Sequence, residues 1–247
     1  MSAGFIFWRF AMVVVTDIRI PEACHAELER RGFSCVSLPP FSALDPRVAS
    51  HPDMLILPID GHLFVHKDYY AEARETVDSI LRLASLRLVL TDDKVSEQYP
   101  YDVSLNLVVS GNRIIGRQDT MSKTVAAYAE RKDLTVVNVK QGYAKCSTVV
   151  LGDKALITAD PAIEKAARAL SLDVLRITPG HVSLRGYDCG FIGGASGGCH
   201  DTVFFCGNIL SHPDGKTIVD FCSKHAFQVV SLSEESLYDV GTLFFFS

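Results

Sequence analysis

The sequence predicts an α/β protein built from five similar units that close into a ring, and three observations lead to this prediction. A polar motif recurs along the 247 residues at intervals of 42 to 51 residues, the size of one supersecondary unit. Its anchor positions are Asp53, Asp102, Ala144, Asp188 and Asp239. Similar turn and apolar patterns follow the anchors, and the two ends of the chain supply complementary parts of one unit.

The unit over residues 142–185 illustrates the predicted order of elements. Its segment STVVLGDKALITAD contains two apolar runs joined by Gly152-Asp153, a pair typical of hairpin turns. Pro161 then opens a stretch with apolar residues at helical spacing, and DVLRITPG has the pattern of a returning strand. The unit is therefore predicted to run strand, hairpin, strand, helix, strand.

The same order recurs over residues 51–99, 100–141 and 186–237. The remaining unit is split, because residues 12–50 have the pattern of a strand, a helix and a strand, while residues 238–247 add one more strand. Pairing of that last strand with the first unit would close the ring and hide its sheet edges. A doubly wound α/β domain is the competing fold, but it explains neither the hairpins nor the split unit. We expect a single domain over residues 12–247.

Composition excludes several classes of protein. The chain has a net charge of −5 and no basic run, so we expect no nucleic-acid partner. Residues 1–11 are apolar but contain Arg9 and lack the features of a signal peptide, so they are predicted to be a leader or an extra N-terminal segment. They are also too short to span a membrane. Seven cysteines without a C-x-x-C pair indicate reduced thiols in the cytoplasm.

Five units of this kind resemble the pentein fold. This five-bladed α/β propeller is shared by arginine deiminases, dimethylarginine dimethylaminohydrolases, amidinotransferases and agmatine deiminases. The resemblance runs from about Met12 to the end of the chain and lies in the plan of the units more than in their residues. It implies that the first strand of each unit lies near the axis and directs side chains into a central funnel. In these enzymes carboxylates bind the guanidinium group of the substrate, a His transfers protons and a Cys attacks the substrate.

The resemblance implies a cluster of ligand-binding residues at the axis. The expected members are Asp53, Asp102, Asn106, Lys145, Asp188, Asp239, Gly193 and Gly194. Four acids and one lysine suit a small cationic or zwitterionic ligand, such as a guanidino or amino compound, and the glycines would form a rim or flexible wall. Alternatively, each aspartate caps a turn at the boundary of its own unit.

Two departures from the pentein pattern argue against the standard reaction. The segment GYAKCST resembles the Gly-Leu-His-Leu-Lys segment of the dimethylarginine hydrolases, with Lys145 in register but Tyr143 at the position of the catalytic His. The final strand offers Thr242 and no thiol where those enzymes carry their Cys. The candidate replacement is Cys146, with His51 as base, because the adjacent Lys145 would lower the pKa of the thiol.

Three functional interpretations follow from these residues. The favoured one is a protein that binds a small guanidino or amino compound and lacks the standard Cys/His pair. An amidinohydrolase or amidinotransferase that uses Cys146 is the first alternative, and a propeller that binds a macromolecule, as the related ribosome anti-association factor does, is the second. A metal-dependent hydrolase is a remote possibility, since no spacing such as H-E-x-x-H occurs, and neither a metal nor a cofactor is expected. The oligomeric state is not predicted.

Overall fold

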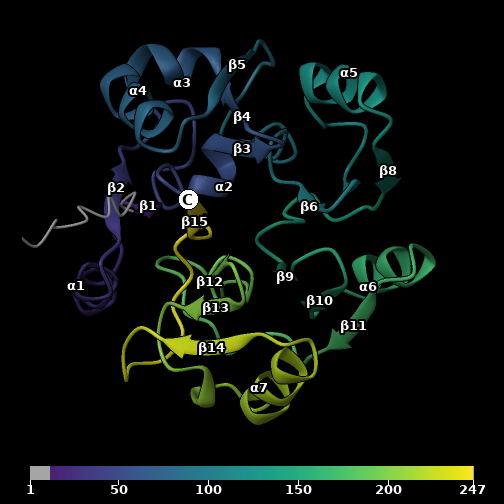
Figure 1. Cartoon of the computed structure of the whole chain (residues 1–247). Helices are drawn as coiled ribbons and strands as arrows, with labels where there is room; N and C mark the ends of the chain where they lie inside the picture. The colour runs from purple at the N-terminus through teal and green to yellow at the C-terminus, as the bar shows by residue number, and fades with distance from the viewer. Residues whose placement is uncertain (1–11, 247) are drawn as a thin grey trace, which may run out of the picture.

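The computed structural model describes residues 12–246, so the predicted leader over residues 1–11 lies outside the described part of the chain. The strands are β1 (Val13–Asp17), β2 (Ser34–Leu38), β3 (Ile56–Ile59), β4 (His62–His66), β5 (Arg87–Thr91), β6 (Val108–Ser110), β7 (Arg113–Gly116), β8 (Thr135–Asn138), β9 (Thr148–Leu151), β10 (Ala155–Thr158), β11 (Asp173–Arg176), β12 (Ser196–Cys199), β13 (Thr202–Phe205), β14 (Gln228–Ser231) and β15 (Phe244–Phe246) (Figure 1). The helices are α1 (Glu22–Arg30), α2 (Pro52–Leu55), α3 (Lys67–Glu72), α4 (Arg74–Leu83), α5 (Lys123–Arg131), α6 (Pro161–Ala169) and α7 (Gly215–Lys224), with a 3₁₀ turn at Ile209–Ser211.

These strands form five sheets of three strands each. The sheets are β15-β1-β2, β3-β4-β5, β6-β7-β8, β9-β10-β11 and β12-β13-β14. In the last four, an antiparallel hairpin is followed by a helical connection to a parallel third strand. In the first sheet β15 runs antiparallel to β1, with Val13 opposite Phe246 and Val15 opposite Phe244. The predicted pairing of the last strand with the first unit is therefore confirmed.

Residues with positive φ close the hairpins where the sequence predicted turns. Gly111 and Gly152 have φ values of 60° and 62°, and the turn between β3 and β4 uses Asp60 and Gly61 at 47° and 71°. Glycine adopts this left-handed region without a steric penalty, so it allows tight turns that match the twist of the strands. These short turns keep the first and second strands of each unit in register.

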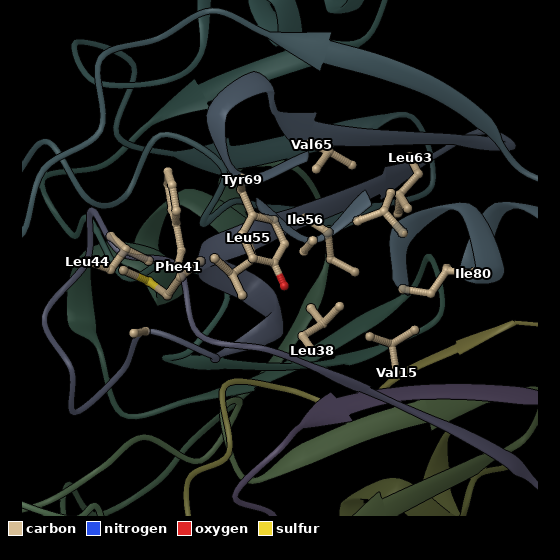
Figure 2. Close-up of a cluster of buried hydrophobic side chains, with 14 of the residues drawn as sticks. Val15, Leu38, Phe41, Leu44, Leu55, Ile56, Leu63, Val65, Tyr69 and Ile80 are labelled. Atoms are coloured by element: carbon tan, nitrogen blue, oxygen red, sulfur yellow. The ribbon is translucent and has the colours of Figure 1, made fainter. Parts of the chain in front are cut away.

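The hydrophobic core consists of five clusters, each formed mainly by residues of two neighbouring units. Figure 2 shows one of them, in which Val15 and Leu38 from the first unit pack with Leu55, Ile56 and Ile80 from the second. The units are thus held together by shared apolar surfaces rather than by separate cores. No helix within residues 12–246 is long and apolar enough to cross a membrane.

Candidate functional site

The first strands of the five units lie nearest the centre of the view in Figure 1, and the residues that precede them meet there. The residues two positions before β3, β6, β9, β12 and β15 are Met54, Asn106, Cys146, Gly194 and Thr242. Their backbones are linked directly, because Gly194 N–H donates to Cys146 C=O and Thr242 N–H donates to Gly194 C=O, both at 2.8 Å. Equivalent positions of units far apart in sequence therefore form one central layer.

Asp53 holds the polar side chains of this layer together. Its Oδ2 accepts hydrogen bonds from Cys146 Sγ at 2.9 Å and from Thr242 Oγ1 at 2.8 Å. Lys145 Nζ donates to Thr242 Oγ1 at 3.1 Å and to Thr148 C=O at 3.4 Å. Asp53, Cys146 and Thr242 are all buried, so these bonds form in a low-dielectric environment where they are strengthened.

Asn106 fixes the segment that carries Lys145 and Cys146. Its Oδ1 accepts from the backbone N–H of Lys145 at 2.8 Å and of Cys146 at 3.2 Å. Its Nδ2 donates to Cys146 Sγ at 3.3 Å and to Met54 Sδ at 3.4 Å. Asn106 is fully buried, so its position among these partners indicates a positioning role rather than contact with a ligand.

A cavity of about 180 Å³ lies on one side of the layer. It is lined by Val48, His51, Met54, Tyr143, Cys146, Leu184, Tyr187, Cys189, Phe191 and Asp239. Three aromatic rings, Tyr143, Tyr187 and Phe191, contribute to its wall, and the ring centroids of Tyr143 and Phe191 are 6.1 Å apart. Apolar walls with a few polar groups are typical of small-molecule sites.

Asp239 is the buried carboxylate of this cavity. Its Oδ2 accepts from Phe191 N–H at 2.8 Å and its Oδ1 from Gly241 N–H at 2.9 Å. His51 stands beside it, with Nδ1 at 3.9 Å from Asp239 Oδ1 and Nε2 at 3.7 Å from Asp17 Oδ2. Burial raises the pKa of Asp239, an effect that His51 opposes and the Asp53 carboxylate increases.

Tyr143 lines the same cavity and is hydrogen-bonded to Asp102. Its hydroxyl donates to Asp102 Oδ2 at 2.6 Å. Burial raises the pKa of both groups, and for Tyr143 the hydrogen bond to Asp102 adds to the effect. The phenol therefore stays protonated at neutral pH and cannot replace the proton-shuttling His expected from the pentein resemblance.

Comparison with known proteins identifies the family of this chain. Residues 15–244 match the family of unknown function DUF6873. The chain belongs to this family. None of the curated proteins matches it.

Three solved structures share the fold of this DUF6873 protein at low sequence identity. Dimethylarginine dimethylaminohydrolase from Pseudomonas aeruginosa, complexed with citrulline, is 11% identical with a TM-score of 0.52, covering 90% of this chain and 91% of that one. An amidinotransferase of saxitoxin biosynthesis from Microseira wollei is 13% identical with a TM-score of 0.55, covering 90% and 88%. Agmatine deiminase from C. jejuni is 8% identical with a TM-score of 0.54, covering 90% and 87%. All three are pentein enzymes, so the resemblance inferred from the sequence is confirmed for the fold.

The expectation that Lys145 activates Cys146 is wrong for this DUF6873 chain. The pKa of the Cys146 thiol is raised well above its usual value, first by burial and then by the Asp53 and Asp239 carboxylates. Lys145 directs its amine to Thr242 and Thr148 instead of to the thiol. Burial also lowers the pKa of Lys145 itself. Cys146 is therefore a protonated donor to Asp53 rather than an activated nucleophile.

Asp188 does not join the cluster, contrary to the sequence prediction. It is exposed and lies at a separate surface hollow with Ser183 and Ser211. The motif comparison matched Asp188 to Asp53 by residue type, but Asp53 stands three residues before its first strand and the equivalent position in the unit over residues 186–237 is Gly193. The longer loop of that unit carries Asp188 away from the axis.

Gly193 and Gly194 are buried in the layer and form no flexible rim. A Cβ at Gly194 would collide with the Asp239 carboxylate, and a Cβ at Gly193 would collide with the backbone of Lys145 and Thr148. Glycine is needed here because neighbouring backbone and side chains approach too closely for any other residue. Gly194 thus leaves room for the buried Asp239 carboxylate, and Gly193 leaves room for the backbone of Lys145 and Thr148.

A second cavity borders the layer at other residues. This funnel of about 390 Å³ is lined by first-strand residues such as Val109 and Val149, and Lys145 and Thr242 also border it. Lys145 therefore belongs to a different cavity from His51 and Asp239. The two cavities share no lining residue, so the predicted single funnel is replaced by two separate spaces.

Several residues of the site were missed by sequence reasoning. Asp17, Met54, Tyr187 and Phe191 approach or line the cavity, yet none was among the predicted site residues. Asp17 ends β1, so its position could have been found from the rule that polar residues at strand ends meet at one edge of the fold. Tyr187 and Phe191 lie in the longer loop of the unit over residues 186–237, whose path the sequence did not determine.

Proposed function

We propose that this protein binds a small organic cation, a guanidino or amino compound, in the cavity beside Asp239. The observation that carries the proposal is a buried carboxylate at the wall of an aromatic-lined cavity. Carboxylates pair with guanidinium and ammonium groups, and aromatic faces attract cations. The volume of about 180 Å³ lies below the roughly 300–1,000 Å³ of sites for drug-sized molecules, which favours a small metabolite.

The proposal includes a closed five-bladed propeller as the scaffold. The pairing of β15 with β1 and the cluster that joins Phe33 to Phe204 and Phe245 support it. In such a ring the segments before the five first strands converge on the axis, which explains how residues as distant as His51 and Asp239 share one cavity.

Binding without the conventional pentein reaction is the favoured form of the proposal. Tyr143 is hydrogen-bonded to Asp102, Thr242 is buried in the layer, and the raised pKa of Cys146 keeps that thiol protonated. A nucleophile needs a deprotonated form or an adjacent base that accepts its proton. Within residues 12–246 the carboxylate that accepts a hydrogen bond from Cys146 is that of Asp53, and this contact stabilises the protonated thiol.

Calorimetric titration of metal-free protein with arginine, agmatine and putrescine tests the proposal. At least one is expected to bind, and citrulline, which lacks the side-chain charge of arginine, is expected to bind more weakly than arginine. The Asp239→Asn variant should lose about 10- to 100-fold in affinity, because hydrogen bonds to charged groups contribute about 1.5–3 kcal/mol. Affinity should also fall as the pH is lowered, because the raised pKa of Asp239 lets protons compete with the ligand.

Asp188→Asn is the matched control, since it removes an exposed carboxylate from a neighbouring loop. It should leave the affinity unchanged. Equal affinity of wild-type protein and the Asp239→Asn variant, or equal loss in both variants, would contradict the proposed site. Release of ammonia, urea or citrulline during the titration would instead favour an amidino-modifying enzyme.

A further inference from the structure

His51, Asp53 and Cys146 bring three different metal-ligating groups together beside the cavity. One ligand atom from each, a ring nitrogen, a carboxylate oxygen and the thiol sulfur, lies within 4.8 Å of the other two. All three side chains are buried, with exposed fractions of 3%, 1% and 4%. His51 and Asp53 come from the start of the unit over residues 51–99, and Cys146 comes from the start of the unit over residues 142–185. The fold brings these two segments together.

Asp53 has an oxygen free to accept a further partner. Its Oδ2 already accepts from Cys146 and Thr242, whereas its Oδ1 is buried and has no hydrogen-bond partner among residues 12–246. A buried carboxylate oxygen without a partner is costly, so its presence points to a group that the protein alone does not supply. A cation satisfies such an oxygen directly.

The donor set favours zinc over other common cations. Thiolate and imidazole ligands select Zn²⁺, whereas Ca²⁺ and Mg²⁺ require shells of oxygen ligands. Zinc bonds of about 2.3 Å to sulfur and about 2.0 Å to oxygen place tetrahedral S and O ligands about 3.5 Å apart. Cys146 Sγ lies 2.9 Å from the Asp53 carboxylate with a proton between them, so an ion that replaces the proton and binds this carboxylate, including its unpartnered Oδ1, requires only a small shift of the side chains.

We propose that His51, Asp53 and Cys146 bind one Zn²⁺ ion, with a fourth coordination position open to the cavity. Binding forms a bond from the metal to Cys146 Sγ, and the thiol proton leaves to solvent. Asp239, whose Oδ1 lies 3.9 Å from His51 Nδ1, would orient the imidazole as an outer-sphere partner. Three protein ligands and one open position are the arrangement of catalytic zinc sites. The proposal goes beyond ligand binding and does not depend on the ligand's identity.

Cobalt substitution of chelator-treated, full-length protein provides the direct test. Co²⁺ bound to a thiolate produces a sulfur-to-metal charge-transfer band, which sites made of nitrogen and oxygen ligands lack. One equivalent of Co²⁺ should produce this band, and Zn²⁺ should displace Co²⁺ with loss of the band. Wild-type protein that binds no Co²⁺, or binds it without the band, would overturn the proposal whatever the variants do.

Matched variants then assign the ligands. Cys146→Ala should abolish the charge-transfer band, while Cys222→Ala, which removes another buried thiol far along the chain on α7, should retain it. His51→Ala and Asp53→Asn should each weaken Zn²⁺ binding at least about tenfold, whereas Asp188→Asn should not. Far-ultraviolet circular dichroism of each metal-free variant verifies folding. A band that persists in folded Cys146→Ala protein would assign the metal to another cysteine and refute the site.

Discussion

At the scale of single residues, burial decides the chemistry of Cys146. The thiol is 4% exposed and donates to Asp53, and two nearby carboxylates add to the rise in its pKa caused by burial. The reactive species of cysteine is the thiolate, so both protonation and lack of access protect this residue. Its hydrogen bonds to Asp53 and Asn106 within the buried layer indicate a structural or metal-binding role, not that of a nucleophile.

Alkylation of the metal-free protein at neutral pH checks this assignment. Cys189 is exposed at the mouth of the cavity and should be labelled first, whereas Cys146 should be among the last. Peptide mass spectrometry after graded exposure to iodoacetamide measures the order. Labelling of Cys146 ahead of Cys189 would restore the interpretation of Cys146 as an activated nucleophile.

Sequence reasoning located part of the site for a definable reason. Asp53, Asn106 and Cys146 stand two or three residues before predicted first strands, and the structure places these positions together. The prediction for Asp188 was wrong because the unit over residues 186–237 was aligned by residue type and not by distance to its first strand. The separation of Lys145 from the cavity depends on the direction of a side chain, which no sequence pattern specifies.

At the scale of elements, an aspartate before a helix caps it only where its tertiary contacts leave an oxygen directed at the helix start. Asp160 precedes Pro161 and caps α6, with Oδ1 accepting from Ala162 N–H at 2.7 Å and Ile163 N–H at 3.0 Å, while Oδ2 accepts from Gln141 Nε2 at 3.1 Å. Asp214 precedes α7 in a similar way, but its Oδ2 accepts from Thr178 N–H at 2.6 Å and leaves the helix uncapped by this side chain. A contact from another unit therefore draws the Asp214 carboxylate away from the helix start.

The short strand β15 is predicted to be essential for cooperative folding. Phe245 packs against Phe33 and Phe204 at centroid distances of 5.0 and 4.9 Å, so the strand connects the first unit with the sheet β12-β13-β14. Deleting residues 238–247 should remove this connection and the β1 pairing, and urea unfolding should lose its single sharp transition. Unfolding curves followed by circular dichroism and by tyrosine fluorescence should then give different midpoints.

A single substitution in β15 distinguishes the loss of its contacts with the neighbouring units from disruption of the whole fold. Phe245→Ala should retain a cooperative transition but lower the free energy of unfolding by about 2–4 kcal/mol, because it leaves a cavity between two units. A truncated protein that unfolds in one transition at the wild-type midpoint would contradict the role assigned to β15.

At the scale of the whole molecule, recurring local signals in the sequence predicted the fold but predicted less of the function. Hairpin turns, helix starts and the split unit are local or periodic signals, and they led to five α/β sheets with the last strand paired to the first. The hydrogen bonds that join Asp53, Cys146 and Thr242 across units are a long-range result of packing. Fold similarity to enzymes therefore does not carry their reaction to this chain.

A crystal structure of the protein with agmatine tests the central claim most directly. The proposal predicts a guanidinium or ammonium nitrogen within about 3 Å of an Asp239 carboxylate oxygen, between the aromatic walls, with Cys146 unmodified. Agmatine bound in the wider funnel beside Lys145, or a covalent adduct on Cys146, would contradict it.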